Sequence, residues 1–211
     1  MTRAVRAAAP GFDAALGGRA ARLVRSDGVE VELAVGRWRD PASAGDAWLL
    51  DRCTGPAIDL GCGPGRLVEA LVARRVPALG VDASAAAQLL CRGRGAPMVR
   101  RDVFAPLPAE GCWDHVLLAD GNIGIGGDPV ALLRRSARLV ARGGTVLVET
   151  DPDPALWWRG AVRVCTADGS GAALPWACAG ADALAAVAPR AGLRRAGGLD
   201  GPRSFVELRR T

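Results

Sequence analysis

Residues 57–71 read AIDLGCGPGRLVEAL, and this stretch decides the fold. A short apolar run predicts a buried strand at 57–60, and leucines and valines at helical spacing predict a helix over 64–75. Between them lie Gly61, Gly63 and Gly65. Glycines at such a turn let a ligand approach the backbone closely. The stretch therefore predicts a strand, a ligand-binding loop and a helix in succession.

The composition is typical of one soluble globular domain, which we expect to span residues 1–211. Half of the 211 residues are hydrophobic and 23% are charged. No uninterrupted apolar run is long enough for a bilayer span, so we expect no membrane contact and a cytoplasmic protein. Six scattered cysteines and a single histidine predict free thiols and no metal site. The net charge of +5 comes from dispersed arginines with few aromatic neighbours, so we expect no nucleic-acid binding.

Beyond residue 71 the chain alternates between short apolar strands and helices. Strands are predicted at 77–82, 96–103, 113–120 and 145–150. Ser84 is expected to cap a helix that reaches about Cys91, and Asp128-Pro129 to start one that stops at Gly143-Gly144. This alternation predicts a cofactor-binding half at 55–150 with a parallel sheet covered on both faces, a three-layer α/β sandwich.

The flanking segments predict additions to this sheet. In residues 1–54 a hairpin turns at Ser26-Asp27-Gly28, with an alternating strand up to Val35, and a helix runs from Asp40-Pro41 to about Cys53. Residues 151–178 predict an inserted hairpin with Trp157 and Trp176, expected to lie as a lid over the carboxyl edge of the sheet. A helix ending at Gly192 and a last strand at 203–210, expected to be antiparallel, complete the segment 179–211.

Three acids occupy the ends of three successive predicted strands. Asp59 precedes the loop, Asp82 ends the second strand and Asp102 ends the third. Asp59 would repel a pyrophosphate but suits an amine, and Arg66 replaces the last glycine of a dinucleotide GxGxxG pattern. S-adenosylmethionine carries such an amine and no phosphate. In this interpretation Asp82 accepts from both ribose hydroxyls, Asp102 accepts from the adenine amino group, and the Val103 N–H reaches a ring nitrogen.

With these motifs the sequence resembles the class I S-adenosylmethionine-dependent methyltransferases. The resemblance rests on DLGCGPGR (59–66), GVD (80–82), RRDVF (100–104) and LVARGGTVLVE (139–149). It implies a seven-stranded, mostly parallel sheet whose last strand inserts antiparallel, and methyl transfer to a small-molecule acceptor. The predicted cofactor-binding residues are Asp59, Gly61, Cys62, Gly63, Gly65, Asp82, Ala83, Asp102, Val103 and Asp120.

Asp120 and Asn122 follow the fourth predicted strand and are the candidate catalytic residues. They would position the acceptor or the methionine tail of the donor; the alternative is a glycine-rich turn held by its own side chains. The resemblance makes this the fourth motif, but it departs from the Asn/Asp-Pro-Pro-aromatic form of amino methyltransferases, so the nucleophilic atom stays open. His115 lies inside a strand and is expected to be structural. Asp120, Glu149 and Asp151 are better placed to act as a base.

Other functions compete with this interpretation. An NAD(P)-linked oxidoreductase uses a similar loop, although Asp59 and Arg66 argue against it. A methyltransferase-like fold kept as an inactive binding module would retain the same acids. Methylation of protein or RNA lacks support from an added recognition domain. The acceptor and the oligomeric state are not determined by the sequence.

Overall fold

A computed structural model describes residues 11–211 and has a seven-stranded central sheet in the order β11-β12-β7-β6-β3-β4-β5. Its strands are β3 (Ala57–Leu60), β4 (Ala78–Asp82), β5 (Met98–Arg100), β6 (Trp113–Leu118), β7 (Val140–Thr150), β11 (Leu193–Leu199) and β12 (Ser204–Arg210). Strand β12 is antiparallel to β7 and β11, and the other pairs are parallel. The predicted fold class, including the antiparallel last strand, is confirmed.

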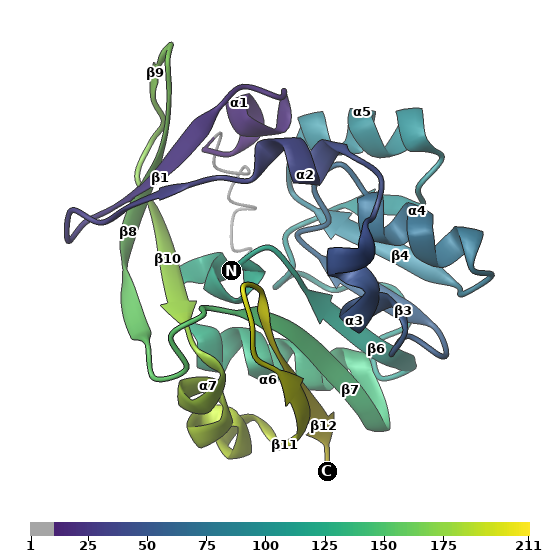
Figure 1. The fold of residues 1–211 in the computed structure, drawn as a ribbon. Coiled ribbons are helices and arrows are strands. Elements are labelled where there is room, and N and C mark those ends of the chain that lie inside the picture. Colours follow the sequence, from purple (N-terminus) through teal and green to yellow (C-terminus); the bar gives the residue numbers. More distant parts are fainter. Residues whose placement is uncertain (1–10) are drawn as a thin grey trace, which may run out of the picture.

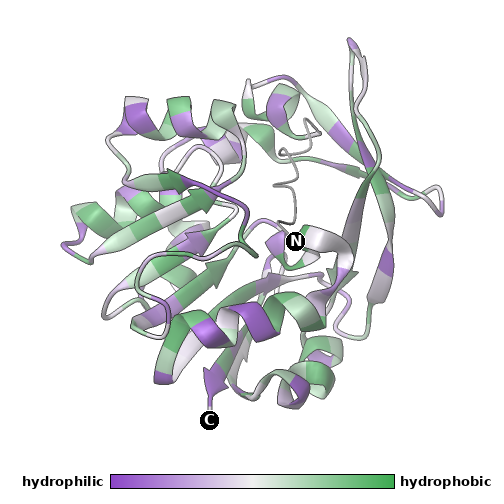
Figure 2. Cartoon of the chain, turned by 180° about the vertical axis from the view of Figure 1, so that it is seen from behind, coloured by the Kyte–Doolittle hydropathy of each residue, from purple (hydrophilic) through white to green (hydrophobic). Residues whose placement is uncertain are grey.

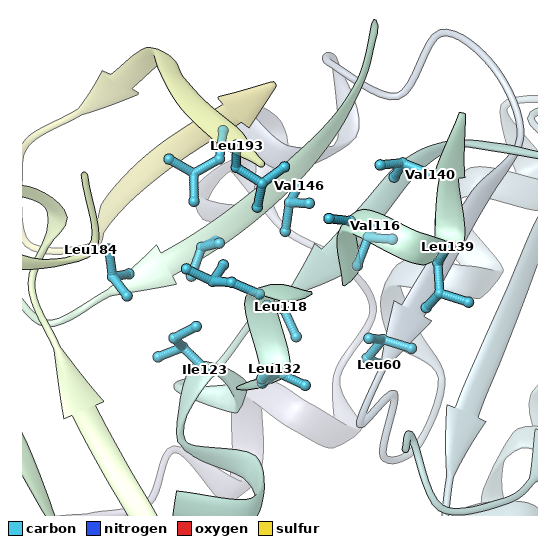
Figure 3. Close-up of a cluster of buried hydrophobic side chains, with 14 of the residues drawn as sticks. Leu60, Val116, Leu118, Ile123, Leu132, Leu139, Val140, Val146, Leu184 and Leu193 are labelled. Carbon is cyan, nitrogen blue, oxygen red and sulfur yellow. The ribbon is translucent and has the colours of Figure 1, made fainter. Parts of the chain in front are cut away.

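Helices cover both faces of this sheet. Successive buried side chains of β6 point to opposite faces, so both faces need a covering layer. Val116 and Leu118 point into a cluster with α6 (Pro129–Leu139) and α7 (Ala181–Val187), part of which Figure 3 shows. Leu117 points to the opposite cluster with α3 (Ala47–Leu50) and α4 (Arg66–Ala73). Helix α5 (Ala85–Arg94) packs beside α4 through Cys91. In Figure 2 the strands are mostly hydrophobic, whereas the helices carry mixed surfaces.

A second, five-stranded sheet stands apart from the first in Figure 1. Its strands are β1 (Ala21–Arg25), β2 (Glu30–Glu32), β8 (Trp157–Thr166), β9 (Gly169–Ser170) and β10 (Leu174–Ala179). The two predicted hairpins are present, and β1 pairs antiparallel with β8, with Leu23 opposite Val164. This pairing joins the N-terminal segment to the insert, and the sequence analysis did not predict it.

The segment between the hairpin and β3 differs from its prediction. Val35 begins helix α2 (Val35–Arg39) instead of ending a strand, and Asp40 leaves that helix with extended backbone. Ser43 and Asp46 form a capping box on the 3₁₀ turn η1 (Ala44–Asp46), which leads into α3. The predicted helix from Asp40 to Cys53 is therefore wrong over its first turn, because Ser43 supplies the cap that Asp40-Pro41 was expected to supply.

A second boundary differs near the glycine pair. Helix α6 begins with the predicted Asp128 cap but ends at Leu139, and strand β7 starts at Val140. Gly143, with φ +80°, lies inside β7 where the pairing with β6 shifts register, so the glycines mark a bulge and not a helix end. Ser84 caps α5 as predicted. No helix in residues 11–211 is long and apolar enough to cross a membrane.

Three short helical elements complete the described chain. These are α1 (Asp13–Leu16), the 3₁₀ segment η2 (Asn122–Gly127) after β6, and η3 (Ala188–Ala191) after α7. Gly192 ends η3 in the left-handed conformation, at the predicted position. Both α1 and η2 border the space between the two sheets and contribute to the site described below.

Candidate functional site

A cavity of about 470 Å³ lies between the carboxyl ends of the central strands and the second sheet. Most ligand-binding clefts have volumes between about 300 and 1,000 Å³. The central sheet contributes the glycine loop and the acids at its strand ends, and the second sheet contributes apolar side chains. All of the predicted cofactor-binding residues except Gly65 line this cavity: Asp59, Gly61, Cys62, Gly63, Asp82, Ala83, Asp102, Val103 and Asp120.

The loop depends on glycine at each predicted position. Gly61, Gly63 and Gly65 have φ angles of +77°, +51° and +84°, where other residues are strained. A Cβ on Gly65 would lie 2.8 Å from Cys91 Sγ, and one on Gly61 would lie 2.7 Å from Asn122 Nδ2. Gly65 therefore lies behind the cavity and keeps the loop close to α5.

Asp82 connects the loop to the second strand. Its Oδ2 accepts a hydrogen bond from the Gly63 N–H at 3.0 Å, and its Oδ1 accepts one from the Ser84 N–H at 2.8 Å. Burial raises the pKa of Asp82, although these two hydrogen bonds lower it. Each oxygen can accept a further hydrogen bond, because a carboxylate oxygen accepts about two, and Asp82 lines the cavity.

Asp59 is the most deeply buried of the three acids, with 3% of its surface exposed. Its Oδ1 has no hydrogen-bond partner within residues 11–211. Burial raises the pKa of Asp59 to about 7, and the Arg66 charge offsets only part of this shift. A buried carboxylate without a partner is costly in free energy, so this site is suited to the cationic group of a ligand.

Asp102 and Val103 lie at the outer end of the acid series. Asp102 is exposed, and its Oδ1 accepts a hydrogen bond from the Phe104 N–H at 2.9 Å. The Val103 carbonyl accepts from buried Arg135 Nε at 2.8 Å, which holds this turn against α6. The turn is therefore anchored from behind while the Asp102 carboxylate faces solvent and the cavity.

Asp120 has a different environment from these three acids. Its oxygens accept from Arg37 Nη2 at 2.8 Å and from Arg66 Nη2 at 2.6 Å. Its backbone has φ +53°, and its N–H donates to Glu149 Oε2 at 2.7 Å. Arg66 Nη1 also lies 2.6 Å from Asp46 Oδ1, an ion pair without hydrogen-bond geometry. Asp120 is thus held by two arginines that the sequence analysis did not assign to the site.

Arg203 completes this ion-pair network. Its Nε and Nη2 donate to the two oxygens of Glu149 at 2.8 and 2.7 Å, and its Nη1 donates to Asp46 Oδ1 at 2.8 Å. Burial lowers the pKa of Arg203, but the carboxylates of Glu149 and Asp46 more than offset this and raise it. The network contains three arginines and three acids and is neutral overall: Arg37, Arg66, Arg203, Asp46, Asp120 and Glu149.

The side-chain amide of Asn122 hydrogen-bonds to the glycine loop. Its Nδ2 donates to the carbonyls of Leu60 and Gly61 at 3.0 and 2.9 Å. The side chain therefore joins η2 to the end of β3 and to the glycine loop, and does not hydrogen-bond within its own turn. Asn122 still lines the cavity, where its amide oxygen is the polar atom left to meet a ligand.

The remaining candidates divide between core and cavity. His115 is buried, with Nδ1 2.8 Å from Thr145 Oγ1 and Nε2 accepting from the Thr54 N–H, and lies outside the cavity lining. Burial lowers its pKa. Trp176 lines the cavity, whereas Trp157 is exposed and does not. Trp48 stacks on Phe205 in the core.

Comparisons with known proteins agree with this geometry. Residues 58–148 match the family model described as a methyltransferase domain. A search of curated protein sequences finds no match to this chain. A SAM-dependent methyltransferase from Bacteroides fragilis, solved with S-adenosyl-L-homocysteine, has a TM-score of 0.78 at 19% identity, over 98% of this chain and 97% of that one.

Two further solved structures have related folds. An amino pentose methyltransferase from Micromonospora echinaspora, solved with SAM, has a TM-score of 0.61 at 18% identity, over 84% of this chain and 95% of that one. A 1,6-didemethyltoxoflavin-N1-methyltransferase from Burkholderia thailandensis has a TM-score of 0.55 at 17% identity, over 82% and 78% of the two chains. The fold is thus that of a class I methyltransferase, and residues 58–148 are the part of the chain that matches the methyltransferase family model.

Proposed function

We propose that this protein binds S-adenosylmethionine in the cavity and transfers its methyl group to a small-molecule acceptor. The observation that carries the proposal is the set of Asp59, Asp82 and Asp102 at the ends of β3, β4 and β5, lining one cavity with the glycine loop. None of the three forms an ion pair with an arginine in the described chain, so all three remain free for a ligand.

The residues present fit this donor. The orphaned, buried Asp59 Oδ1 matches an ammonium group, and the two oxygens of Asp82 match two ribose hydroxyls. The adenine would extend toward Asp102 and Val103 at the end of β5. The strand order β3-β4-β5 arranges these groups in one line, with adjacent strands about 4.8 Å apart.

The bound donor would supply a methyl carbon already activated by a positive sulfur. The chain then has to align the acceptor with that carbon and exclude water, and effective molarity supplies several kcal/mol of the barrier reduction. The second sheet closes the cavity with Leu23 of β1 and Trp176 of β10, and Leu33 follows directly after β2. We propose that Asp120 positions the donor tail through its backbone and its arginine partners, since both carboxylate oxygens are already bound to arginine.

The alternatives have weaker support. A dinucleotide would place its pyrophosphate beside the loop, where buried Asp59 would repel it. An inactive binding module would keep the acids, so it differs from an enzyme only in turnover. The six free cysteines support a cytoplasmic location, because thiols stay reduced there. No free run of arginines lines the described cavity, which supports a small-molecule acceptor over a nucleic acid.

Calorimetry on the purified protein tests the donor assignment. We expect S-adenosylmethionine and S-adenosylhomocysteine to bind with dissociation constants in the micromolar range, about 8 kcal/mol of binding free energy, and NADH not to bind. Tight NADH binding without S-adenosylmethionine binding would refute the proposal. Transfer of a labelled methyl group to any compound in a metabolite mixture would then separate an enzyme from an inactive binding module.

A further inference from the structure

The cavity extends past the donor residues toward β6 and β7. In the sheet order β7-β6-β3-β4-β5, the donor acids occupy β3 to β5, so the acceptor side falls at the ends of β6 and β7. The residues that line the cavity include Thr150 and Asp151 at the end of β7 and Trp176 from β10. This part of the cavity carries the groups that select an acceptor.

The wall opposite the central sheet is aromatic and aliphatic. The Phe12 ring lies 5.2 Å from the Trp176 ring and 6.4 Å from the Trp38 ring, between centroids. Leucines and valines of the second sheet extend this wall. Gly124 and Gly127 allow Trp176 to approach η2, because a Cβ on Gly124 would lie 2.4 Å from Trp176 Nε1. The acceptor therefore has to present a substantial apolar part to this wall.

We call the part of the cavity at the ends of β6 and β7, together with its aromatic wall, the acceptor chamber. The charges around this chamber disfavour an anionic acceptor. Arg66 is the one cationic side chain among the described residues that line the cavity, and both of its terminal nitrogens face carboxylates. Arg37 and Arg203, behind the lining, are likewise bound to Asp120 and Glu149. Arg37 keeps an Nε without a partner but does not line the cavity, so a carboxylate or phosphate on the acceptor would meet uncompensated acids and no free arginine among the described lining residues.

Two polar groups at the end of β7 remain available. Thr150 is buried, and its Oγ1 has no hydrogen-bond partner in the described part of the chain. Asp151 accepts one hydrogen bond from the Asp153 N–H at 3.0 Å and forms no ion pair with any described residue. Asp120 and Glu149 differ, because arginines hold both of them. Asp151 is thus the carboxylate on the acceptor side that is free to receive an N–H group.

We propose that this chamber binds a hydrophobic amine as the methyl acceptor, with its apolar part against Phe12, Trp38 and Trp176 and its nitrogen at Thr150 and Asp151. This proposal rests on the proposed function and names its substrate class. Asp151 binds the ammonium form, and the neutral amine that forms when one proton passes to water presents its nitrogen lone pair to the methyl group. The lone pair forms the new N–C bond while the C–S bond breaks, and the electron pair of that bond stays on sulfur, which becomes a neutral thioether.

Matched compounds with one phenylbutyl group test this assignment by equilibrium binding. We expect 4-phenylbutylamine to bind at least about tenfold more tightly than 4-phenylbutan-1-ol and 4-phenylbutyrate, and ethanolamine, which lacks the apolar part, to bind most weakly. Each compound is measured with and without saturating S-adenosylhomocysteine. Loss of S-adenosylhomocysteine binding alone overturns the proposed function, whereas the compound series on the free protein still decides the acceptor class.

Variants separate the two halves of the chamber. Asp151→Asn should abolish the preference for the amine over the alcohol while S-adenosylhomocysteine binds as before, and Asp200→Asn, an exposed control, should change neither. Trp38→Leu should weaken the amine and the alcohol by equal factors. Equal binding of amine, alcohol and acid, failure of all of them to bind, or an unchanged preference in Asp151→Asn would each overturn the assignment.

Discussion

The carboxylates at the rim of the cavity fall into two groups with opposite surroundings. At the ends of β3, β4 and β5, Asp59, Asp82 and Asp102 have no arginine partner. At the ends of β6 and β7, three arginines lie within 4 Å of the Asp120 carboxylate and two within 4 Å of the Glu149 carboxylate. Both groups follow parallel strands of the same sheet, so position in the fold does not explain the difference.

The comparison distinguishes binding groups from supporting groups. Acids without a partner keep their hydrogen-bonding capacity for a ligand, but the fold carries the cost of burying them. Acids paired with arginine are neutralised and hold distant segments together, as Arg37 of α2 and Arg203 before β12 show. A carboxylate beside a cavity is therefore a candidate ligand-binding group only when the protein leaves it unpaired.

The largest expected effect comes from breaking the paired group. Arg66→Met should lower the free energy of unfolding by about 3 kcal/mol, because it removes a buried guanidinium that two acids share and leaves Asp46 and Asp120 each with one arginine fewer. Urea unfolding measures this change. Arg74→Met, at the end of the same helix, removes an exposed pair with Asp51 and should cost less than about 1 kcal/mol. Equal losses in the two variants would show that the network contributes no special stability.

Removing a charge from the unpaired group should have the opposite sign. The pKa of Asp59 is about 7 in the folded protein against 3.8 in a model peptide, so the unfolded state is favoured progressively as pH rises from about 4 through 7. Asp59→Asn should therefore raise the free energy of unfolding at pH 8 by about 1–3 kcal/mol and change it little at pH 4. Thermal melts at the two pH values measure this difference.

The same variant should lose donor affinity, which makes Asp59 a site where stability is sacrificed for binding. In the unsubstituted protein the donor affinity should fall below pH 7, because protonated Asp59 cannot pair with an ammonium group. Asp59→Asn should bind weakly at every pH. An Asn variant that is stabilised and still binds S-adenosylmethionine normally would remove Asp59 from the site.

Asp82→Ala should weaken S-adenosylmethionine binding by about 1–3 kcal/mol, the scale of lost hydrogen bonds to a charged group. Part of the loss comes from the loop, since the Gly63 N–H also loses its acceptor. Calorimetry gives the change, and Asp114→Ala, an exposed acid at the far end of β6, is the matched control. An unchanged affinity in Asp82→Ala would contradict the ribose assignment.

The smallest effect is expected at the exposed end of the series. Asp102→Ala should weaken donor binding by about 0.5–1.5 kcal/mol, because water competes for an exposed carboxylate. The Asp102 variant should therefore bind more tightly than the Asp82 variant in the same titration. A larger loss at Asp102 than at Asp82 would reverse the assumed order of burial and binding.

The pairing of the inserted hairpin with β1 changes how its role is interpreted. The sequence predicts a lid over the carboxyl edge of the sheet. A lid without other partners could be shortened without affecting donor binding. Strand β8 instead pairs with β1, and Val162, Val164 and Trp176 share a core with Leu23. Shortening the hairpin would expose that core and remove one wall of the cavity, so single substitutions such as Trp38→Leu are the better test of the acceptor side.

The sequence by itself determined the central sheet, the glycine loop and the position of three acids at successive strand ends. These features are local: a buried strand needs an apolar run, a left-handed turn needs glycine, and parallel strands all present their carboxyl ends at one edge. The sequence did not determine the placement of Trp48 and Trp176, because a buried aromatic can fill a core or line a cavity with the same local pattern.

Only the tertiary structure decided which acids are free and how the cavity is closed. Arg37 and Asp120 are 83 positions apart in the chain, and Glu149 and Arg203 are 54 apart. The sequence pattern around an arginine does not indicate which distant acid its long side chain will pair with. The pairing of β1 with β8 likewise depends on which exposed strand edges meet after the central sheet has formed, and alternation within each hairpin carries no information about that choice.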